Sequence, residues 1–301
     1  MQRRGLAVAA LALAPVLATA ACGAESPDAA ATSPSVVATT TVLGDVVADI
    51  AACAGGTAST LMPIGTDPHD FSPSSAQVAD VVGADLVVAN GLGLEEGLTD
   101  ALESAAADGA VVIEVAPLLD PREDAGSLDP HFWHDVSRMA EAARLVGDEM
   151  ASVTGDARYA ECGDEVATTL LETDTEVRAA LSLVPDDRRV LVTDHDALGY
   201  LADAYDFEVA GVVVPGGATL AQPSSQQLSD LVAVIEAEDV PAIFSNTAAP
   251  TSLTEAVAAE VGGQVEVVEL FVGSLGPDGS GAETYAGMVL TNAERIAEAL
   301  G

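Results

Sequence analysis

The sequence contains no lysine. Its 10 basic residues are therefore all arginines, and they stand against 48 acidic residues, for a formal net charge of -38. A surface this acidic repels a polyanion, so we expect no nucleic acid as a partner. The acidity is in itself typical of a solvated, self-repelling surface and does not predict a metal site. It does raise the local concentration of cations around any cleft.

Long apolar runs are missing from the body of the chain, so we expect no membrane-spanning helix there. Near the N-terminus, two arginines precede an apolar run over residues 6–18, which is typical of an export signal. The Ala20-Ala21-Cys22 segment that follows resembles a bacterial lipobox, in which the signal is removed and the new N-terminal cysteine is acylated. We predict a lipoprotein signal peptide over residues 1–21 and an extracytoplasmic protein anchored to the cell membrane by a lipid on Cys22. The alternative is an ordinary secretory signal with an incidental cysteine.

Residues 22–35 are rich in alanine, serine, proline and threonine, which predicts a flexible tether. From Val36 onward, short β-branched runs alternate with longer helical patterns, as in βαβ units around a mostly parallel sheet. A long stretch over residues 156–184 carries apolar residues at helical spacing and predicts a linking helix. The predicted fold is α/β, with two βα-type lobes over residues 36–155 and 185–301 that have mostly parallel sheets and are joined by this long spine helix.

The individual elements follow from the same patterns. Strands are predicted at residues 36–40, 58–63, 86–90, 111–115, 190–193, 209–214, 242–245 and 265–270. Helices are predicted at residues 43–52, 74–82, 94–107, from 134 to about 153, 156–183, 195–205, 226–237, 251–261 and 283–300. Residues 117–130 are predicted to form an acidic loop.

Cysteine is scarce, with three residues in the chain. When Cys22 is assigned to the lipid, Cys53 and Cys162 remain, and exported proteins occupy compartments where disulfides persist. We predict that these two residues form a disulfide. The alternatives are two buried free thiols or thiolate metal ligands, and neither cysteine lies in a Cys-x-x-Cys motif.

Histidine is nearly as scarce, with four residues, and three of them share one context. His69, His131 and His195 each follow a predicted strand and come at or before the start of a helix. Such loops line the crevice at the carboxyl ends of parallel strands, where ligands bind. Neutral imidazole is a good zinc ligand, and three imidazoles leave a fourth position for a carboxylate or water. We therefore predict a transition-metal site in the inter-lobe cleft, with an accessory or surface role for His134.

The residues beside these histidines suit such a site. Pro68 and Pro130, each directly before a histidine, stiffen the loops. Several aspartates are available either to hydrogen-bond the imidazoles or to cap the following helices, and both roles are open for Asp67, Asp70, Asp129, Asp194 and Asp196.

Four segments together resemble the zinc/manganese ABC-transporter solute-binding proteins, in order and spacing from about residue 36 to 300. They are Leu61-Met62-Pro63-Ile64-Gly65-Thr66-Asp67-Pro68-His69-Asp70-Phe71, Asp129-Pro130-His131-Phe132-Trp133, His195-Asp196-Ala197-Leu198-Gly199-Tyr200-Leu201 and Ala282-Glu283-Thr284-Tyr285. The resemblance implies that the three histidines bind the metal between two lobes joined by a long helix. It also implies zinc in preference to manganese, since manganese binders of the family often carry glutamate where this chain has His195.

The sequence departs from the family pattern at the fourth ligand. Many members place an aspartate where this chain has Gly273, which has no side chain to offer. Water, Asp278 or Glu269 are the alternatives for completing the coordination, and water is favoured.

The resemblance implies an extracytoplasmic solute-binding lipoprotein that captures zinc, with manganese possible, and delivers it to an ABC-transporter permease. A three-histidine zinc site with an open position also describes a catalytic centre. The sequence contains no His-Glu-x-x-His motif and no recognisable serine or cysteine nucleophile, so we predict that the protein is not an enzyme. A zinc-dependent hydrolase and a metal-dependent adhesin are the alternatives from other classes.

Overall fold

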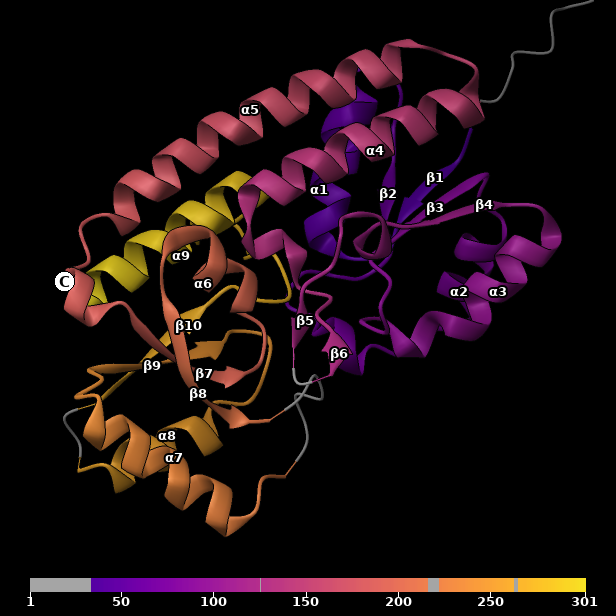
Figure 1. The fold of residues 1–301 in the computed structure, drawn as a ribbon. Helices are drawn as coiled ribbons and strands as arrows, with labels where there is room; N and C mark the ends of the chain where they lie inside the picture. Colours follow the sequence, from indigo (N-terminus) through magenta and orange to yellow (C-terminus); the bar gives the residue numbers. More distant parts are fainter. Residues whose placement is uncertain (1–33, 125, 216–221, 263–264) are drawn as a thin grey trace, which may run out of the picture. The chain divides into compact units, whose positions relative to one another are not determined.

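Two four-stranded parallel sheets organise the computed structural model, which describes residues 34–124, 126–215, 222–262 and 265–301 (Figure 1). The first sheet has the order β2-β1-β3-β4, with strands Ser59–Thr60, Val36–Ala38, Leu86–Ala89 and Val111–Glu114. The second has the order β10-β9-β7-β8, with strands Glu266–Leu270, Ala242–Asn246, Val190–His195 and Glu208–Val214. The strand pairs within both sheets are parallel. The predicted α/β fold with two parallel sheets is confirmed.

Helices connect and cover these strands. The first half contributes α1 (Thr41–Cys53), α2 (Ser75–Val82) and α3 (Thr99–Asp108), and the second contributes α6 (Gly199–Tyr205), α7 (Ser225–Ala237) and α8 (Ser252–Glu260). Capping boxes formed by Ser74 with Gln77 and by Ser224 with Gln227 begin α2 and α7, which is why each helix starts where it does.

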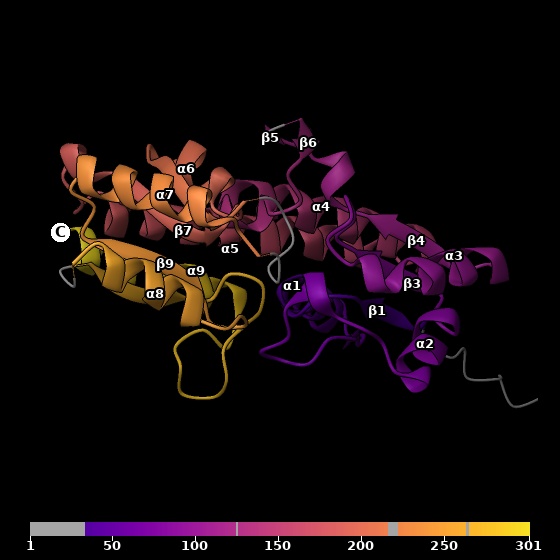
Figure 2. The same cartoon turned by 90° about the horizontal axis from the view of Figure 1, so that it is seen from below.

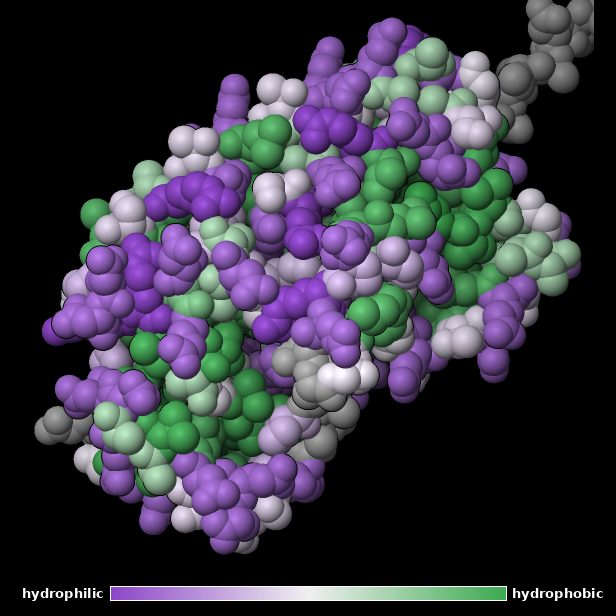
Figure 3. Space-filling model, in the orientation of Figure 1, coloured by the Kyte–Doolittle hydropathy of each residue, from purple (hydrophilic) through white to green (hydrophobic). Residues whose placement is uncertain are grey.

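Among three longer helices, α5 (Arg158–Leu181) packs against α4 (Val136–Thr154) and α9 (Tyr285–Leu300), and all three contact α1. Helix α5 runs beside elements of both halves (Figures 1 and 2). Its apolar residues Leu170, Val177 and Leu181 are buried, whereas hydrophilic side chains cover much of its outer surface (Figure 3). Gly163, which interrupts the apolar pattern, allows close approach to α4, because a Cβ at Gly163 would lie 2.8 Å from the carbonyl oxygen of Ala143.

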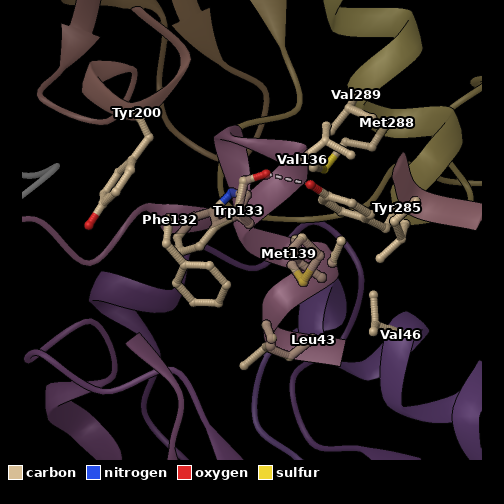
Figure 4. Close-up of a cluster of buried hydrophobic side chains, with 14 of the residues drawn as sticks. Leu43, Val46, Phe132, Trp133, Val136, Met139, Tyr200, Tyr285, Met288 and Val289 are labelled. Atoms are coloured by element: carbon tan, nitrogen blue, oxygen red, sulfur yellow. Dashed lines mark hydrogen bonds between the residues drawn. The ribbon is translucent and has the colours of Figure 1, made fainter. Parts of the chain in front are cut away.

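The largest apolar core connects the two sheets. It contains buried residues of the first sheet, such as Val88, and of the second, such as Leu191 and Phe244. Between them lie side chains of α1, α4 and α9, with Leu43, Met139 and Met288 among those drawn in Figure 4. Smaller cores lie beneath α2 and α3 and beneath α7 and α8. All described residues belong to one compact unit.

Two local predictions were wrong. The helix expected from His195 begins at Gly199, because His195 is still part of β7 and pairs with Val214 of β8. The expected loop over residues 117–130 contains a short hairpin, β5 (Glu123–Asp124) and β6 (Ser127–Leu128). Its charged residues lack the alternating apolar pattern that would have marked strands.

The predicted signal peptide and Cys22 lie outside the described residues. Among the residues that are described, no helix combines the length and apolarity needed to cross a bilayer.

Candidate metal centre

The structure brings together the three histidines singled out from the sequence. His69 lies in the short turn Pro68–Asp70, His131 directly precedes the turn Phe132–His134, and His195 is the last residue of β7. One ring nitrogen from each lies within 4.8 Å of the others, and His69 Nε2 is 3.1 Å from His131 Nε2. Two imidazole nitrogens that share a tetrahedral zinc ion lie about 3.4 Å apart. The three side chains are therefore arranged to surround an ion after only small movements.

Two aspartates fix which nitrogen faces this centre. His131 Nδ1 lies 2.9 Å from Asp129 Oδ1, and His195 Nδ1 lies 2.8 Å from Asp194 Oδ1. Because a carboxylate only accepts hydrogen bonds, each Nδ1 carries the proton and each Nε2 presents a lone pair. This is the arrangement that orients histidine ligands in metal sites. Of the two roles left open for the aspartates, Asp129 and Asp194 hydrogen-bond the imidazoles, and Asp67 caps the turn by accepting from the His69 N–H.

Burial and neighbouring charges separate the three histidines by pKa. Burial lowers the pKa of His69, and repulsion from His131 and His195 lowers it further, to about 3. Burial also lowers the pKa of His131, although the hydrogen bond to Asp129 opposes the shift. At His195 burial acts in the same direction, but the hydrogen bond and charge of Asp194 outweigh it and the pKa is raised. His195 is therefore the histidine at which a proton competes most strongly with a metal.

A buried carboxylate, Glu95, holds the loop behind His131. Its Oε1 accepts hydrogen bonds from Thr39 Oγ1 at 2.6 Å and from the Asn90 N–H at 2.7 Å, and its Oε2 accepts from the Gly91 N–H. Asn90 Nδ2 in turn donates to the carbonyl of Pro130, directly before His131. Burial raises the pKa of Glu95, and the three hydrogen bonds oppose that shift. The ends of β1 and β3 and the His131 loop are thus connected through the side chains of Glu95 and Asn90.

Trp133 ties the His131 loop to the C-terminal part of the chain. Its Nε1 donates to the carbonyl of Val272 at 2.9 Å, and its own carbonyl accepts from the Tyr285 hydroxyl at 2.6 Å (Figure 4). Farther along the same segment, the Gly65 N–H donates to Ser274 Oγ at 2.8 Å. The loops of His69 and His131 are therefore both fastened to residues 272–285.

Arg122 connects the centre to α6. Its Nη1 lies 3.4 Å from Asp129 Oδ2, and its Nε donates to Asp203 Oδ2 at 2.9 Å. Its backbone N–H donates to the Tyr200 hydroxyl, which itself donates to the Asp129 carbonyl. The aspartate that orients His131 is thereby linked to the second half of the chain, directly through Tyr200 and indirectly through Arg122 and Asp203.

Among the described residues, no side chain supplies a ligand at the fourth coordination position. Glu269 and Asp278 are exposed, and the cluster of possible metal ligands found among the described residues contains the three histidines alone. A Cβ at Gly273 would lie 2.8 Å from Pro68 Cδ, next to His69. The absence of a side chain at Gly273 therefore lets the His69 loop approach closely.

His134 does not lie at the surface, so that part of the expectation was wrong. It is 3% exposed, and its Nε2 has no hydrogen-bond partner among the described residues. Its ring packs beside Trp133, with ring centroids 5.4 Å apart, so it lies against an aromatic side chain in the protein interior.

Cys53 of α1 and Cys162 of α5 lie with their sulfur atoms 1.98 Å apart and their Cα atoms 5.8 Å apart. This placement would join α1 to α5. The bond itself stays a prediction for the protein in solution.

Sequence reasoning missed Glu95, Asn90 and Arg122. No local sequence pattern marks Glu95, which follows a predicted strand, or Arg122, which lies in an acidic loop, as a residue that supports a distant histidine. The absence of lysine, which leaves few cations to pair with 48 acidic residues, was the one signal that pointed to the arginines.

Comparison with known proteins agrees with this geometry. Residues 36–299 match the family described as zinc-uptake complex component A, periplasmic. The chain is 33% identical to the zinc-binding protein TroA of Treponema pallidum, covering 91% of this chain and 92% of that one. It is 29% identical to the manganese-binding lipoprotein MntA of Halalkalibacterium halodurans, covering 94% of this chain and 95% of the relative.

The relatives differ in the metal that they are named for. The iron-binding protein YfeA of Yersinia pestis is 29% identical over 97% of this chain and 94% of its own. The solved structure of the periplasmic zinc-binding protein TroA superposes with a TM-score of 0.82 at 30% identity, covering 89% of this chain and 99% of that chain. The family consists of substrate-binding proteins of metal transport and not of enzymes, as predicted. The chain belongs to the zinc-uptake complex component A family of metal-binding, substrate-binding components of ABC transporters.

Proposed function

We propose that this protein captures zinc through His69, His131 and His195 and delivers it to an ABC importer. The observation that carries the proposal is the convergence of three imidazole nitrogens within 4.8 Å of one another. Asp129 and Asp194 hold two of these rings with Nε2 facing the centre. His69 is partly exposed while the other two are buried, so an ion would reach His69 first.

The preference for zinc rests on the chemistry of the donors. Imidazole-rich sites suit zinc, whereas carboxylate-rich sites suit manganese. Here the cluster has three histidines, and Gly273 supplies no carboxylate to the fourth position. Relatives named for zinc, manganese and iron have similar identity to this chain, so the ion follows from the site and not from the relatives.

Zinc selectivity is tested by equilibrium dialysis of the metal-free protein against zinc and manganese, with elemental analysis. We expect one zinc per chain and a preference for zinc over manganese of about 100-fold, as imidazole donors favour the softer ion. Tighter binding of manganese would retain metal capture and overturn the choice of ion. Failure to bind either ion would overturn the function.

The cellular setting is part of the proposal. Relatives are named as lipoproteins, and Cys22 follows a lipobox-like segment, so we place the protein outside the cytoplasm on a lipid anchor. We also divide the chain into the signal peptide 1–21, a tether 22–35, lobes 36–155 and 185–301, and a linking helix 156–184. The importer's permease would recognise the metal-loaded protein. Replacing Cys22 by serine should move the protein from the membrane fraction to the soluble fraction, and an unchanged distribution would contradict the anchor.

A further inference from the structure

Asn246, the last residue of β9, carries a buried hydrogen-bond donor without a partner. The residue is 1% exposed, and its Nδ2 has no hydrogen-bond partner among the described residues. The orientation of its amide is fixed, because Oδ1 accepts a hydrogen bond from the Ala248 N–H at 3.0 Å. Nδ2 is therefore the free end of the group, and a buried donor of this kind costs free energy unless something accepts from it.

The position of Asn246 puts this donor beside the histidines. Strand β9 lies between β7 and β10, and Phe244 pairs with Thr193, which sets Asn246 level with His195. The backbone N–H of Asn246 donates to Asp194 Oδ2 at 2.6 Å, and the other oxygen of Asp194 binds the ring of His195.

The side chain of Asn246 lies close to Gly273, the position at which many family members place an aspartate ligand. Its Nδ2 lies 3.9 Å from the position that a Cβ at Gly273 would occupy. That same position is 2.8 Å from Pro68 Cδ, directly before His69. The donor thus lies among residues that adjoin two of the three proposed ligands.

An amide N–H cannot ligate a cation, but it can donate to a ligand that the cation holds. Three neutral imidazoles leave the charge of a divalent ion uncompensated at an open position. We propose that this position takes an exchangeable ligand, either water or a small monoanion such as a carboxylate, and that Asn246 Nδ2 donates a hydrogen bond to it. The inference rests on the proposed metal site. It adds a non-protein ligand of the metal, which Asn246 holds by a hydrogen bond.

The test uses the protein loaded with Co²⁺, whose visible spectrum reports changes in coordination, and azide as the probe of the open position. Azide should change the spectrum saturably. Asn246→Ala should weaken azide binding about tenfold, as expected for the loss of a hydrogen bond to a charged group, while Co²⁺ still binds. Gln226→Ala, which removes an exposed side-chain amide on α7, is the matched control and should leave azide binding unchanged.

A second variant separates the role of the Nδ2 donor from that of the hydrogen bond between Asn246 Oδ1 and the Ala248 N–H. Asn246→Asp retains an acceptor for the Ala248 N–H but replaces the donor with an oxygen, so it should weaken azide at least as much as Asn246→Ala. Wild-type azide affinity in Asn246→Asp would assign the effect to the loop and overturn the inference. The azide affinity of Asn246→Asp also tests the inference if Asn246→Ala fails to fold.

Two other results distinguish the exchangeable ligand from the metal site itself. A Co²⁺ complex that does not respond to azide would overturn the exchangeable ligand and leave the metal site intact. A protein that does not bind Co²⁺ would instead overturn the proposed function. Adding acetate to protein prepared without carboxylate buffers identifies the resident ligand, since a saturable change indicates a carboxylate position and an unchanged spectrum indicates water; both agree with the inference.

Discussion

His69 Nε2 lies 3.1 Å from His131 Nε2, so two proposed metal ligands are hydrogen-bonded to each other in the metal-free protein. Since His131 donates its Nδ1 proton to Asp129, its Nε2 can only accept, and His69 must be the donor. Metal binding therefore replaces this hydrogen bond and requires His69 to change tautomer, so that its proton lies on Nδ1 and Nε2 presents a lone pair. Burial and the neighbouring His131 and His195 lower the pKa of His69 to about 3, so we expect its ring to be neutral before a metal binds.

Zinc affinity should depend on pH mainly through His195. Its pKa is raised, so the ring holds its proton over a wider pH range than an ordinary histidine, and zinc must displace that proton. Affinity should be constant above the raised pKa and fall about tenfold per pH unit below it, because one proton is released for each ion bound. Isothermal titration of zinc between pH 5 and pH 8 measures this dependence.

The variant Asp194→Asn isolates the cause of that dependence. Removing the carboxylate charge lowers the pKa of His195, so the decline in affinity should begin at a lower pH. An identical pH profile in the variant, after normalisation to its affinity at pH 8, would contradict the assignment.

Arg122 should slow the release of zinc. It bonds Asp129, which orients His131, to Asp203 of α6, so Arg122→Ala frees the loop that carries one ligand. Ion pairs that are partly exposed contribute up to about 1 kcal/mol, which corresponds to a zinc dissociation rate about fivefold faster. Stopped-flow measurement with a chelator gives this rate.

Arg144→Ala is the matched control for that experiment, because it makes the same charge change at an exposed pair with Asp164, 3.2 Å away. The dissociation rate should be unaffected. Equal acceleration in both variants would mean that net charge, and not the bond to Asp129, is responsible.

Glu95 should contribute to stability as well as to the site. Replacing it with alanine leaves the donors of Thr39, Asn90 and Gly91 without their acceptor inside the fold. Each unsatisfied buried group costs about 1–3 kcal/mol, so we expect the free energy of unfolding to drop by about 3 kcal/mol or more. Glu95→Gln keeps one oxygen and should lose less. Urea denaturation compares the two, and an equal loss in both variants would contradict the expectation that one retained acceptor oxygen preserves part of the stability.

The histidines were predictable because each combines a rare residue type with a loop at the end of a strand. Their supports were not predictable, because Glu95, Arg122 and Asn246 act on residues that are distant in the sequence. Asn246 lies beside His195 because β9 is the neighbour of β7 in the sheet, and this strand order cannot be read from one sequence. The helix expected from His195 failed for a related reason, since the β7–β8 ladder extends through His195 and overrides the local pattern.

The predicted Cys53–Cys162 bond should stabilise the protein substantially. It would close a loop of 109 residues, for which the loss of chain entropy in the unfolded state corresponds to about 4–5 kcal/mol. Thiol titration of the denatured, unreduced protein lacking Cys22 should find no free thiol, and reduction should lower the denaturation midpoint. Two titratable thiols before reduction would contradict the prediction.

The most direct test of the three-histidine site uses Trp133, the sole tryptophan, whose ring centroid lies 5.2 Å from that of His131. Its fluorescence should change on zinc addition and saturate at one equivalent, and His131→Ala should weaken binding by at least about 100-fold, as expected when a metal ligand is lost. His134→Ala, which removes the other histidine packed on Trp133, should retain zinc binding at one equivalent. Undiminished zinc binding by His131→Ala would contradict the account.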